Sequence, residues 1–175
     1  MRIDLGCGKN KKEGFIGVDA YAFPGVDVVA DLTGRWPWDD ATVDEAHCSH
    51  FVEHLKAEHR CHFANELWRV LKPGAKATII VPSWSSGRAY GDPTHQWPPV
   101  SEMWFYYLSR SWRDSNAPHT DKAVWEHGFD CDFDASWGYG LHQMLMTRNA
   151  EFQQFAINFY REAAQDIHAT ITKKG

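Results

Sequence analysis

The chain has 175 residues, 43% of them hydrophobic, which is enough apolar material for the core of one ordinary domain without disulfides or metals. A formal net charge of −5 gives no broad positive field and disfavours nucleic acid as a partner. Because the four cysteines form no Cys-x-x-Cys pair, and neither a secretion leader nor a membrane span is evident, we expect reduced thiols, a cytoplasmic location and no membrane contact.

Three short apolar segments near the start predict strands at 2–5, 15–19 and 26–30. The first strand leads into Gly6, Cys7 and Gly8, the second ends on Asp19, and the third is followed by Asp31. Only the six residues 9–14 lie between this glycine loop and the second strand, so any helix there is a turn or two long. The start of the chain therefore consists of strands joined by short turns.

The middle of the chain alternates strand and helix. A strand is predicted at 43–49 and a helix at 57–71, which Lys72, Pro73 and Gly74 terminate. The segment 75–81 is almost wholly apolar, the pattern of a strand buried on both faces. Strands with such connections predict a parallel sheet with helices on its sides.

The second half has a different composition. Pro, Gly, Ser and aromatic residues dominate 82–140, which we interpret as an ordered insertion over the active face, with one helix near 101–108. Its tryptophans favour packing, with a ligand-binding wall as the alternative. A helix at 151–164 with one apolar side and a last strand at 166–172 complete a single domain, 1–175.

The ends of the first three strands carry groups suited to an adenosyl ligand. Gly6 and Gly8 let the backbone approach a ligand carboxylate closely. Asp19 can accept hydrogen bonds from both ribose hydroxyls, and Asp31 is placed to accept one from the adenine amino group, with the Leu32 backbone nearby. Each residue alone is as well explained by an ordinary turn or cap, so the ordered series is what indicates a ligand site.

Several segments in order resemble the class I S-adenosylmethionine (SAM)-dependent methyltransferases: "DLGCG", "GFIGVD", "ADL", "SHFVEHL", "LWRVLKPGAKATIIVP" and "DPTH". The resemblance covers about the first half and implies a three-layer, Rossmann-like α/β fold, with about seven mostly parallel strands and the last antiparallel. It further implies SAM as cofactor, S-adenosylhomocysteine as product, and these contacts: Asp4, Gly6, Cys7 and Gly8 at the methionine end, Asp19 at the ribose, Asp31 and Leu32 at the adenine. Asn10 replaces the third glycine of the family loop, and the first helix is very short.

Methyl transfer is an in-line displacement at an activated sulfonium, so the protein mainly aligns the nucleophile and excludes water. A hydroxyl or protonated amine also needs a base. His50, just past the fourth strand, is the candidate for this role and for a cofactor contact, and Glu53 is placed to orient it. The alternative is that Ser49 and Glu53 only cap a helix start.

A polar cluster follows the strand at 75–81. Asp92, Thr94 and His95 resemble the substrate-side segment of the family, and His95 is a further catalytic candidate, although a turn at Asp92 and Pro93 explains the first two equally well. Together with His50 and Glu53 they have the side chains to bind a divalent ion. Their spacing matches no zinc pattern, so we expect a metal-free site.

The sequence thus predicts methyl transfer from SAM to an oxygen or nitrogen of a small polar acceptor. The alternatives are a SAM-binding or partner protein without catalysis, and a methyltransferase acting on nucleic acid or protein. A dinucleotide oxidoreductase ranks last, because Lys11 stands where the third glycine of Gly-x-Gly-x-x-Gly belongs. Neither the acceptor nor the oligomeric state can be inferred.

Overall fold

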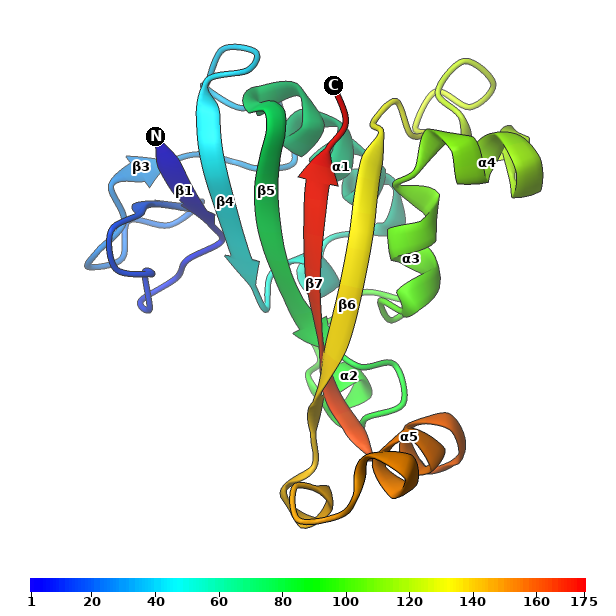
Figure 1. The fold of residues 1–175 in the computed structure, drawn as a ribbon. Coiled ribbons are helices and arrows are strands. Elements are labelled where there is room, and N and C mark those ends of the chain that lie inside the picture. The colour runs from blue at the N-terminus through cyan, green and yellow to red at the C-terminus, as the bar shows by residue number, and fades with distance from the viewer.

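A computed structural model describes residues 1–175, and a seven-stranded sheet of order β3-β2-β1-β4-β5-β7-β6 forms its centre (Figure 1). The strands are β1 (Arg2–Leu5), β2 (Ile16–Asp19), β3 (Val28–Val29), β4 (Val43–Ser49), β5 (Leu71–Pro82), β6 (Phe133–Leu141) and β7 (Ala164–Lys173). β7 runs antiparallel to both its neighbours, and all other paired strands are parallel. The predicted mostly parallel sheet with an antiparallel last strand is confirmed.

The helices follow β4 and lie mainly in the second half. They are α1 (Ala57–Val70), α2 (Arg88–Gly91), α3 (Glu102–Tyr107), α4 (Arg110–Asn116) and α5 (Ala150–Phe159), with 3-10 helices η1 (Val52–His54), η2 (Pro118–Thr120) and η3 (Gln143–Leu145). Between β1 and β2, and between β2 and β3, the chain forms turns without any helix. None of the helices combines the length and the apolar character that crossing a bilayer requires.

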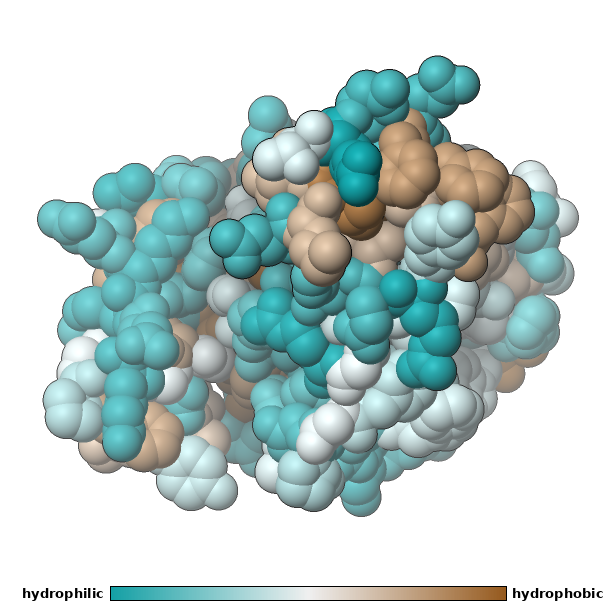
Figure 2. Space-filling view, turned by 90° about the horizontal axis from the view of Figure 1, so that it is seen from below, coloured by the Kyte–Doolittle hydropathy of each residue, from teal (hydrophilic) through white to brown (hydrophobic).

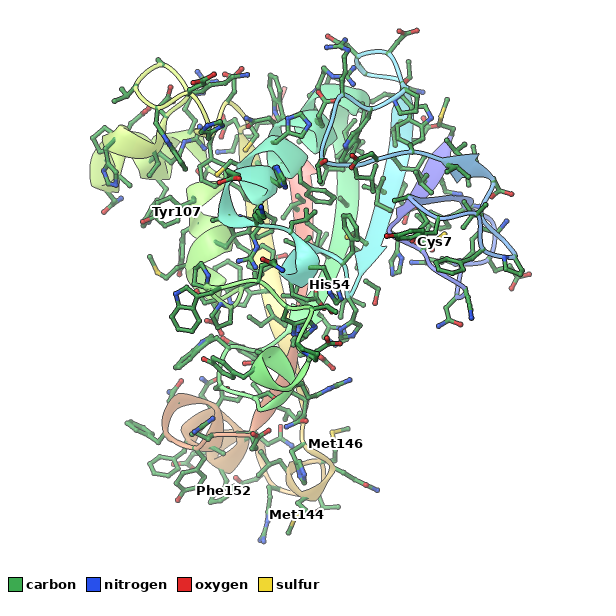
Figure 3. The ribbon with its side chains drawn as sticks, turned by 180° about the vertical axis from the view of Figure 1, so that it is seen from behind. Cys7, His54, Tyr107, Met144, Met146 and Phe152 are labelled. Atoms are coloured by element: carbon green, nitrogen blue, oxygen red, sulfur yellow. The ribbon has the colours of Figure 1, made fainter.

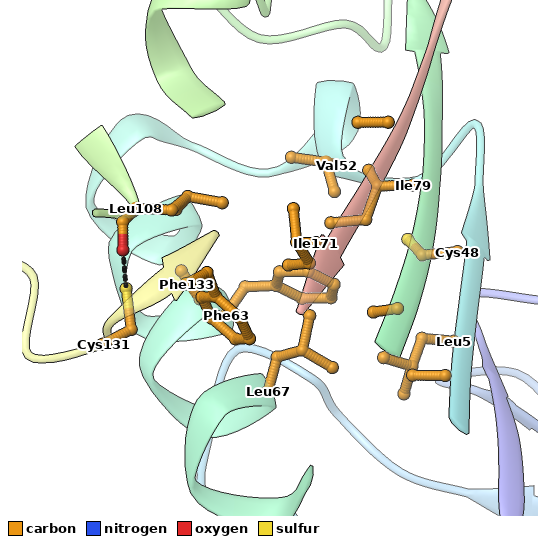
Figure 4. Close-up of a cluster of buried hydrophobic side chains, with 14 of the residues drawn as sticks. Leu5, Cys48, Val52, Phe63, Leu67, Ile79, Leu108, Cys131, Phe133 and Ile171 are labelled. Carbon is orange, nitrogen blue, oxygen red and sulfur yellow. Dashed lines mark hydrogen bonds between the residues drawn. The ribbon is translucent and has the colours of Figure 1, made fainter. Parts of the chain in front are cut away.

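The core lies on one face of the sheet. The apolar side of α1, with Phe63 and Leu67, packs against buried side chains of the strands, among them Leu5, Ile79 and Ile171 (Figure 4). These residues are fully buried. Burial of this apolar surface is the main stabilising contribution to the sheet and fixes the strand ends that the site uses.

The opposite face of the sheet is open. Figure 1 shows α1 and α3 behind the sheet and no helix in front of it. Thr78 and Thr170 face the open side and are partly exposed, whereas their neighbours Ile79 and Ile171 are buried. The interpretation of 75–81 as a strand buried on both faces is therefore wrong, and the expected third layer is missing because the turns joining β1, β2 and β3 are too short to contain helices.

The aromatic segment after β5 is ordered, as expected, but it ends before residue 140, the predicted end of the insertion. The last residues of the predicted insertion 82–140, from 133 onward, belong to strand β6, which pairs with β7. Gly138 and Gly140 weaken the strand pattern there, which is why the sequence pattern does not reveal it. Trp137 of β6 stacks on Phe105 of α3, so this tryptophan serves packing.

Helix α5 begins as predicted and ends five residues early, at Phe159. Asn149 caps it by accepting a hydrogen bond from the Phe152 backbone N–H at 2.9 Å. Its apolar side is not packed away, because Phe152, Phe155 and Phe159 are 39%, 47% and 70% exposed. Figure 2 shows hydrophobic side chains gathered on the face seen from below, the end of the molecule where α5 lies in Figure 1.

Candidate functional site

The loop after β1 is a glycine turn. Gly6 and Gly8 have φ values of +64° and +53°, in the left-handed region that glycine adopts without strain. A Cβ on Gly6 would lie 2.3 Å from the ring of Phe51, so no larger residue fits there. Nothing lies within 4 Å of the corresponding point on Gly8, where the backbone is open to a ligand.

Asp19, at the end of β2, is bonded directly to this loop. Its Oδ2 accepts a hydrogen bond from the Gly8 N–H at 2.9 Å, and its Oδ1 accepts one from the Tyr21 N–H at 3.0 Å. A carboxylate oxygen has two lone pairs, so both oxygens keep acceptor capacity for other donors. The predicted ribose acid and the predicted glycine loop are therefore side by side.

Asp4 lies beneath the loop and is buried. Its Oδ2 accepts from the Lys12 N–H and its Oδ1 from His47 Nδ1, each at 2.7 Å. These bonds fix the loop onto β1 and β4. Cys7 is also largely buried, and burial raises the pKa of its thiol, so the Cys7 side chain supports the loop from inside.

Asp31 and Leu32 follow β3. The Thr33 backbone N–H and hydroxyl both donate to Asp31 Oδ1, at 2.8 and 2.7 Å, and these bonds lower the pKa of Asp31. The side chain of Leu32 is buried, and its carbonyl accepts a bond from Trp36 Nε1. The turn that the sequence offered as an alternative is thus present, on the same edge of the sheet as the glycine loop.

The register of the strands places these residues together. Leu5 pairs with Val18 and Asp19 pairs with Val29 in parallel ladders, so Gly6, Asp19 and Asp31 all lie at the carboxyl edge of β1–β3. Viewed from below, a hollow separates the lobe at the left, where β1–β3 lie, from the rest of the molecule (Figure 2). Ligands of open α/β sheets bind at this kind of edge.

His50 occupies the corresponding place after β4. Its φ is +54°, uncommon for a residue with a side chain, and its N–H donates to the Ile80 carbonyl at 2.8 Å. Its Nδ1 lies 3.3 Å from Glu53 Oε1, a contact that raises the pKa of His50 although it lacks hydrogen-bond alignment. Strain of this kind often marks functional positions.

Two residues that the sequence did not indicate surround His50. Asp166 of β7 places its Oδ1 3.9 Å from His50 Nε2, and its Oδ2 accepts from Arg88 at 2.8 Å. More than a hundred residues separate Asp166 from His50, so no local motif could reveal the contact. Phe51, whose ring lies against Gly6, is a third residue that the sequence did not indicate. Its only signal in the sequence is its position next to His50.

The segment after α2 places His95 against η1. Thr94 Oγ1 donates to Asp92 Oδ1 at 2.6 Å and lies 2.9 Å from His54 Nδ1, and the ring of His54 meets that of His95 edge-on (Figure 3 labels His54). Single potential ligand atoms of Glu53, His54 and His95 lie within 4.8 Å of one another. The predicted polar cluster exists, with His54 as a member in place of His50.

Comparison with known proteins agrees with this geometry. A family model described as a methyltransferase domain matches residues 8–79. The crystal structure of a SAM-dependent methyltransferase from Archaeoglobus fulgidus superposes on this chain with a TM-score of 0.61 and 25% sequence identity. The match covers 99% of this chain and 85% of the Archaeoglobus fulgidus chain. The chain thus contains a methyltransferase domain and shares the class I, Rossmann-like fold of SAM-dependent methyltransferases.

Two further structures share this fold at low sequence identity. A SAM-dependent methyltransferase from Methanosarcina mazei is 14% identical, with 99% of this chain and 92% of that one covered and a TM-score of 0.60. The 1,6-didemethyltoxoflavin-N1-methyltransferase of Burkholderia thailandensis is 12% identical, with 99% and 71% covered and a TM-score of 0.59. No curated protein sequence matches the chain.

Proposed function

We propose that this methyltransferase transfers the methyl group of SAM to an oxygen or nitrogen of a small polar acceptor, with His50 as the base. The observation that carries the proposal is the shared edge: the glycine loop and Asp19 are hydrogen-bonded to each other, and His50 and Glu53 follow the adjacent strand β4. The proposed cofactor contacts and the proposed base are thus on neighbouring strand ends.

On the cofactor side, the Gly6–Gly8 turn, supported by Asp4 and Cys7, borders the methionine carboxylate with the open backbone at Gly8. Asp19 accepts the ribose hydroxyls with the lone pairs that Gly8 and Tyr21 leave free. Asp31 and the Leu32 backbone border the adenine. This assignment follows the order of the strands, because β1, β2 and β3 are successive neighbours in the sheet.

On the acceptor side, the lone pair of the nucleophile forms a bond to the methyl carbon while the carbon–sulfur bond breaks and its electrons go to sulfur. The nucleophile's proton passes to a ring nitrogen of His50, and S-adenosylhomocysteine leaves. Nδ1 of His50 faces the buried Glu53 carboxylate, so Nε2 is the atom that takes the proton. Glu53 orients the ring, and His95 borders the acceptor from the segment after α2.

A small acceptor is supported by the charge of the chain and by one relative of the same fold. The net charge of −5 offers no general attraction for nucleic acid. The Burkholderia thailandensis enzyme was crystallised with the small molecule 1,6-didemethyltoxoflavin and S-adenosylhomocysteine. Steep loss of acceptor binding with added salt would instead favour a nucleic acid acceptor.

The direct test is calorimetry with S-adenosylhomocysteine, followed by product detection from labelled SAM with pools of small hydroxyl and amine compounds. Binding with 1:1 stoichiometry and labelled small product are expected. Tight binding without transfer to any acceptor class would favour a SAM-binding protein that does not catalyse, and transfer only to protein or nucleic acid would contradict the small acceptor.

A further inference from the structure

Glu53, His54 and His95 form a group beside His50, and the carboxylate of Glu53 in this group is buried without a hydrogen-bond partner. Glu53 comes from η1, is 4% exposed, and neither of its carboxylate oxygens has a hydrogen-bond partner. A buried carboxylate without a donor is costly, because its charge loses water and gains nothing in return. The nearest donor, His50 Nδ1, is at 3.3 Å from Oε1, which leaves Oε2 free.

Hydrogen bonds fix the state of both histidines. His95 Nδ1 lies 3.2 Å from the Ala89 carbonyl, which can only accept, so the proton is on Nδ1 and the Nε2 lone pair is free. Thr94 Oγ1 gives its proton to Asp92, so it accepts from His54 Nδ1–H at 2.9 Å. Metal-binding histidines carry partners of this kind on the nitrogen that does not bind the metal.

The two segments that carry these side chains are held together by Arg60 of α1. Arg60 is buried and donates to five backbone carbonyls, of which Val52, Glu53 and Leu55 belong to η1 and its end, and Gln96 and Pro98 follow His95. None of these bonds reaches the Glu53 carboxylate. The backbone of the group is thus preorganised while its ligand atoms remain free.

We propose that Glu53, His54 and His95 form a binding site for one divalent transition ion, with Zn²⁺ as the simplest occupant. Two imidazoles and one carboxylate are a ligand set that such ions prefer. Ligand atoms of tetrahedral zinc lie about 3.3 Å apart, and one potential ligand atom of each of the three residues already lies within 4.8 Å of the others, so they must approach one another by up to about 1.5 Å. If the proposed function holds, the ion would lie close to the base, because Glu53 Oε1 is 3.3 Å from His50 Nδ1.

The test uses the full chain, stripped with a chelator, in Zn²⁺ calorimetry, with S-adenosylhomocysteine binding measured on the same samples. One Zn²⁺ per chain is expected, His54→Ala and His95→Ala should each abolish that binding, and Thr94→Val should weaken it by about 10- to 100-fold, the usual effect of losing a supporting partner. His119→Ala, at an exposed histidine elsewhere, is the matched control.

Zn²⁺ affinity that is absent in the folded wild type, or equal in the wild type, His54→Ala and His95→Ala, would overturn the site. Thermal unfolding of each variant separates loss of binding from loss of folding, and the exposed Thr94 gives a variant with little risk to the fold. Zn²⁺ binding without S-adenosylhomocysteine binding would contradict the proposed function and leave the metal site intact.

Discussion

The two sides of the site are built by different means. The proposed cofactor side, residues 1–33, consists of strand ends and tight turns whose bonds run mostly between near neighbours in sequence, such as Asp19 with Gly8 and Tyr21, and the bond of Asp4 with His47 is an exception. The acceptor side joins η1, the segment after α2 and β7 through long-range contacts of Arg60 and Asp166. Local turns therefore form most of the proposed cofactor side, whereas packing between distant segments assembles the proposed acceptor side.

The largest expected effect tests the acceptor side. His50→Ala should lower kcat by about 10²- to 10⁴-fold, the usual contribution of a positioned base, because the nucleophile's proton then has no acceptor. The affinity for S-adenosylhomocysteine should change much less. Single-turnover kinetics with calorimetry measures both, and His119→Ala serves as control. An unchanged kcat would remove His50 from the mechanism.

Arg60→Met should strongly destabilise the fold on the acceptor side. It removes donors from buried carbonyls of η1 and of the segment after His95, with an expected loss of about 3–5 kcal/mol in the free energy of unfolding. Urea unfolding measures the change, and Arg110→Met, at an exposed arginine, should cost under about 0.5 kcal/mol. Equal effects of the two substitutions would show that Arg60 does not brace the acceptor side.

Asp19→Ala should affect the cofactor side. Losing two charge-assisted hydrogen bonds to the ribose should weaken S-adenosylhomocysteine binding by more than about 100-fold, since each such bond contributes about 1.5–3 kcal/mol. Asp114→Ala is the matched control, because Asp114 is an exposed residue of α4, on the opposite side of the molecule from β1–β3 (Figure 1). If Asp19→Ala lowered the affinity for S-adenosylhomocysteine by less than about threefold, the assignment of Asp19 to the ribose would be contradicted.

The smallest effects separate two glycines of the same loop. Gly8→Ala meets open space and should cost only the backbone strain of a positive φ, about 1–2 kcal/mol. Gly6→Ala adds the clash with Phe51 and should cost clearly more. Thermal unfolding of both variants measures the difference, and adding Phe51→Ala to Gly6→Ala should recover part of the loss. Equal costs would show that Phe51 yields without penalty.

Much of the sheet could be predicted because its signals are local. Apolar runs that end on Gly6, Asp19 and Asp31, and the breakers after α1, mark elements within a few residues of themselves. The parallel order of these strands then brings their ends to one edge. Strand β6 was not predicted, because its glycines interrupt the alternation of apolar and polar residues that marks a strand. The segment 75–81 has the composition of a strand buried on both faces, because Thr78 is one of its few polar residues.

Strand, turn and glycine signals act over short distances, so the sequence by itself predicted the class of fold. Together with the family resemblance, it also supplied the candidate cofactor loop and the candidates His50, Glu53 and His95. Three features emerge only from the folded chain: one face of the sheet stays open, Asp166 and Arg88 reach the His50 region, and His54 joins Glu53 and His95. Those contacts depend on how distant segments pack against one another, and such packing leaves no periodic trace in the chain.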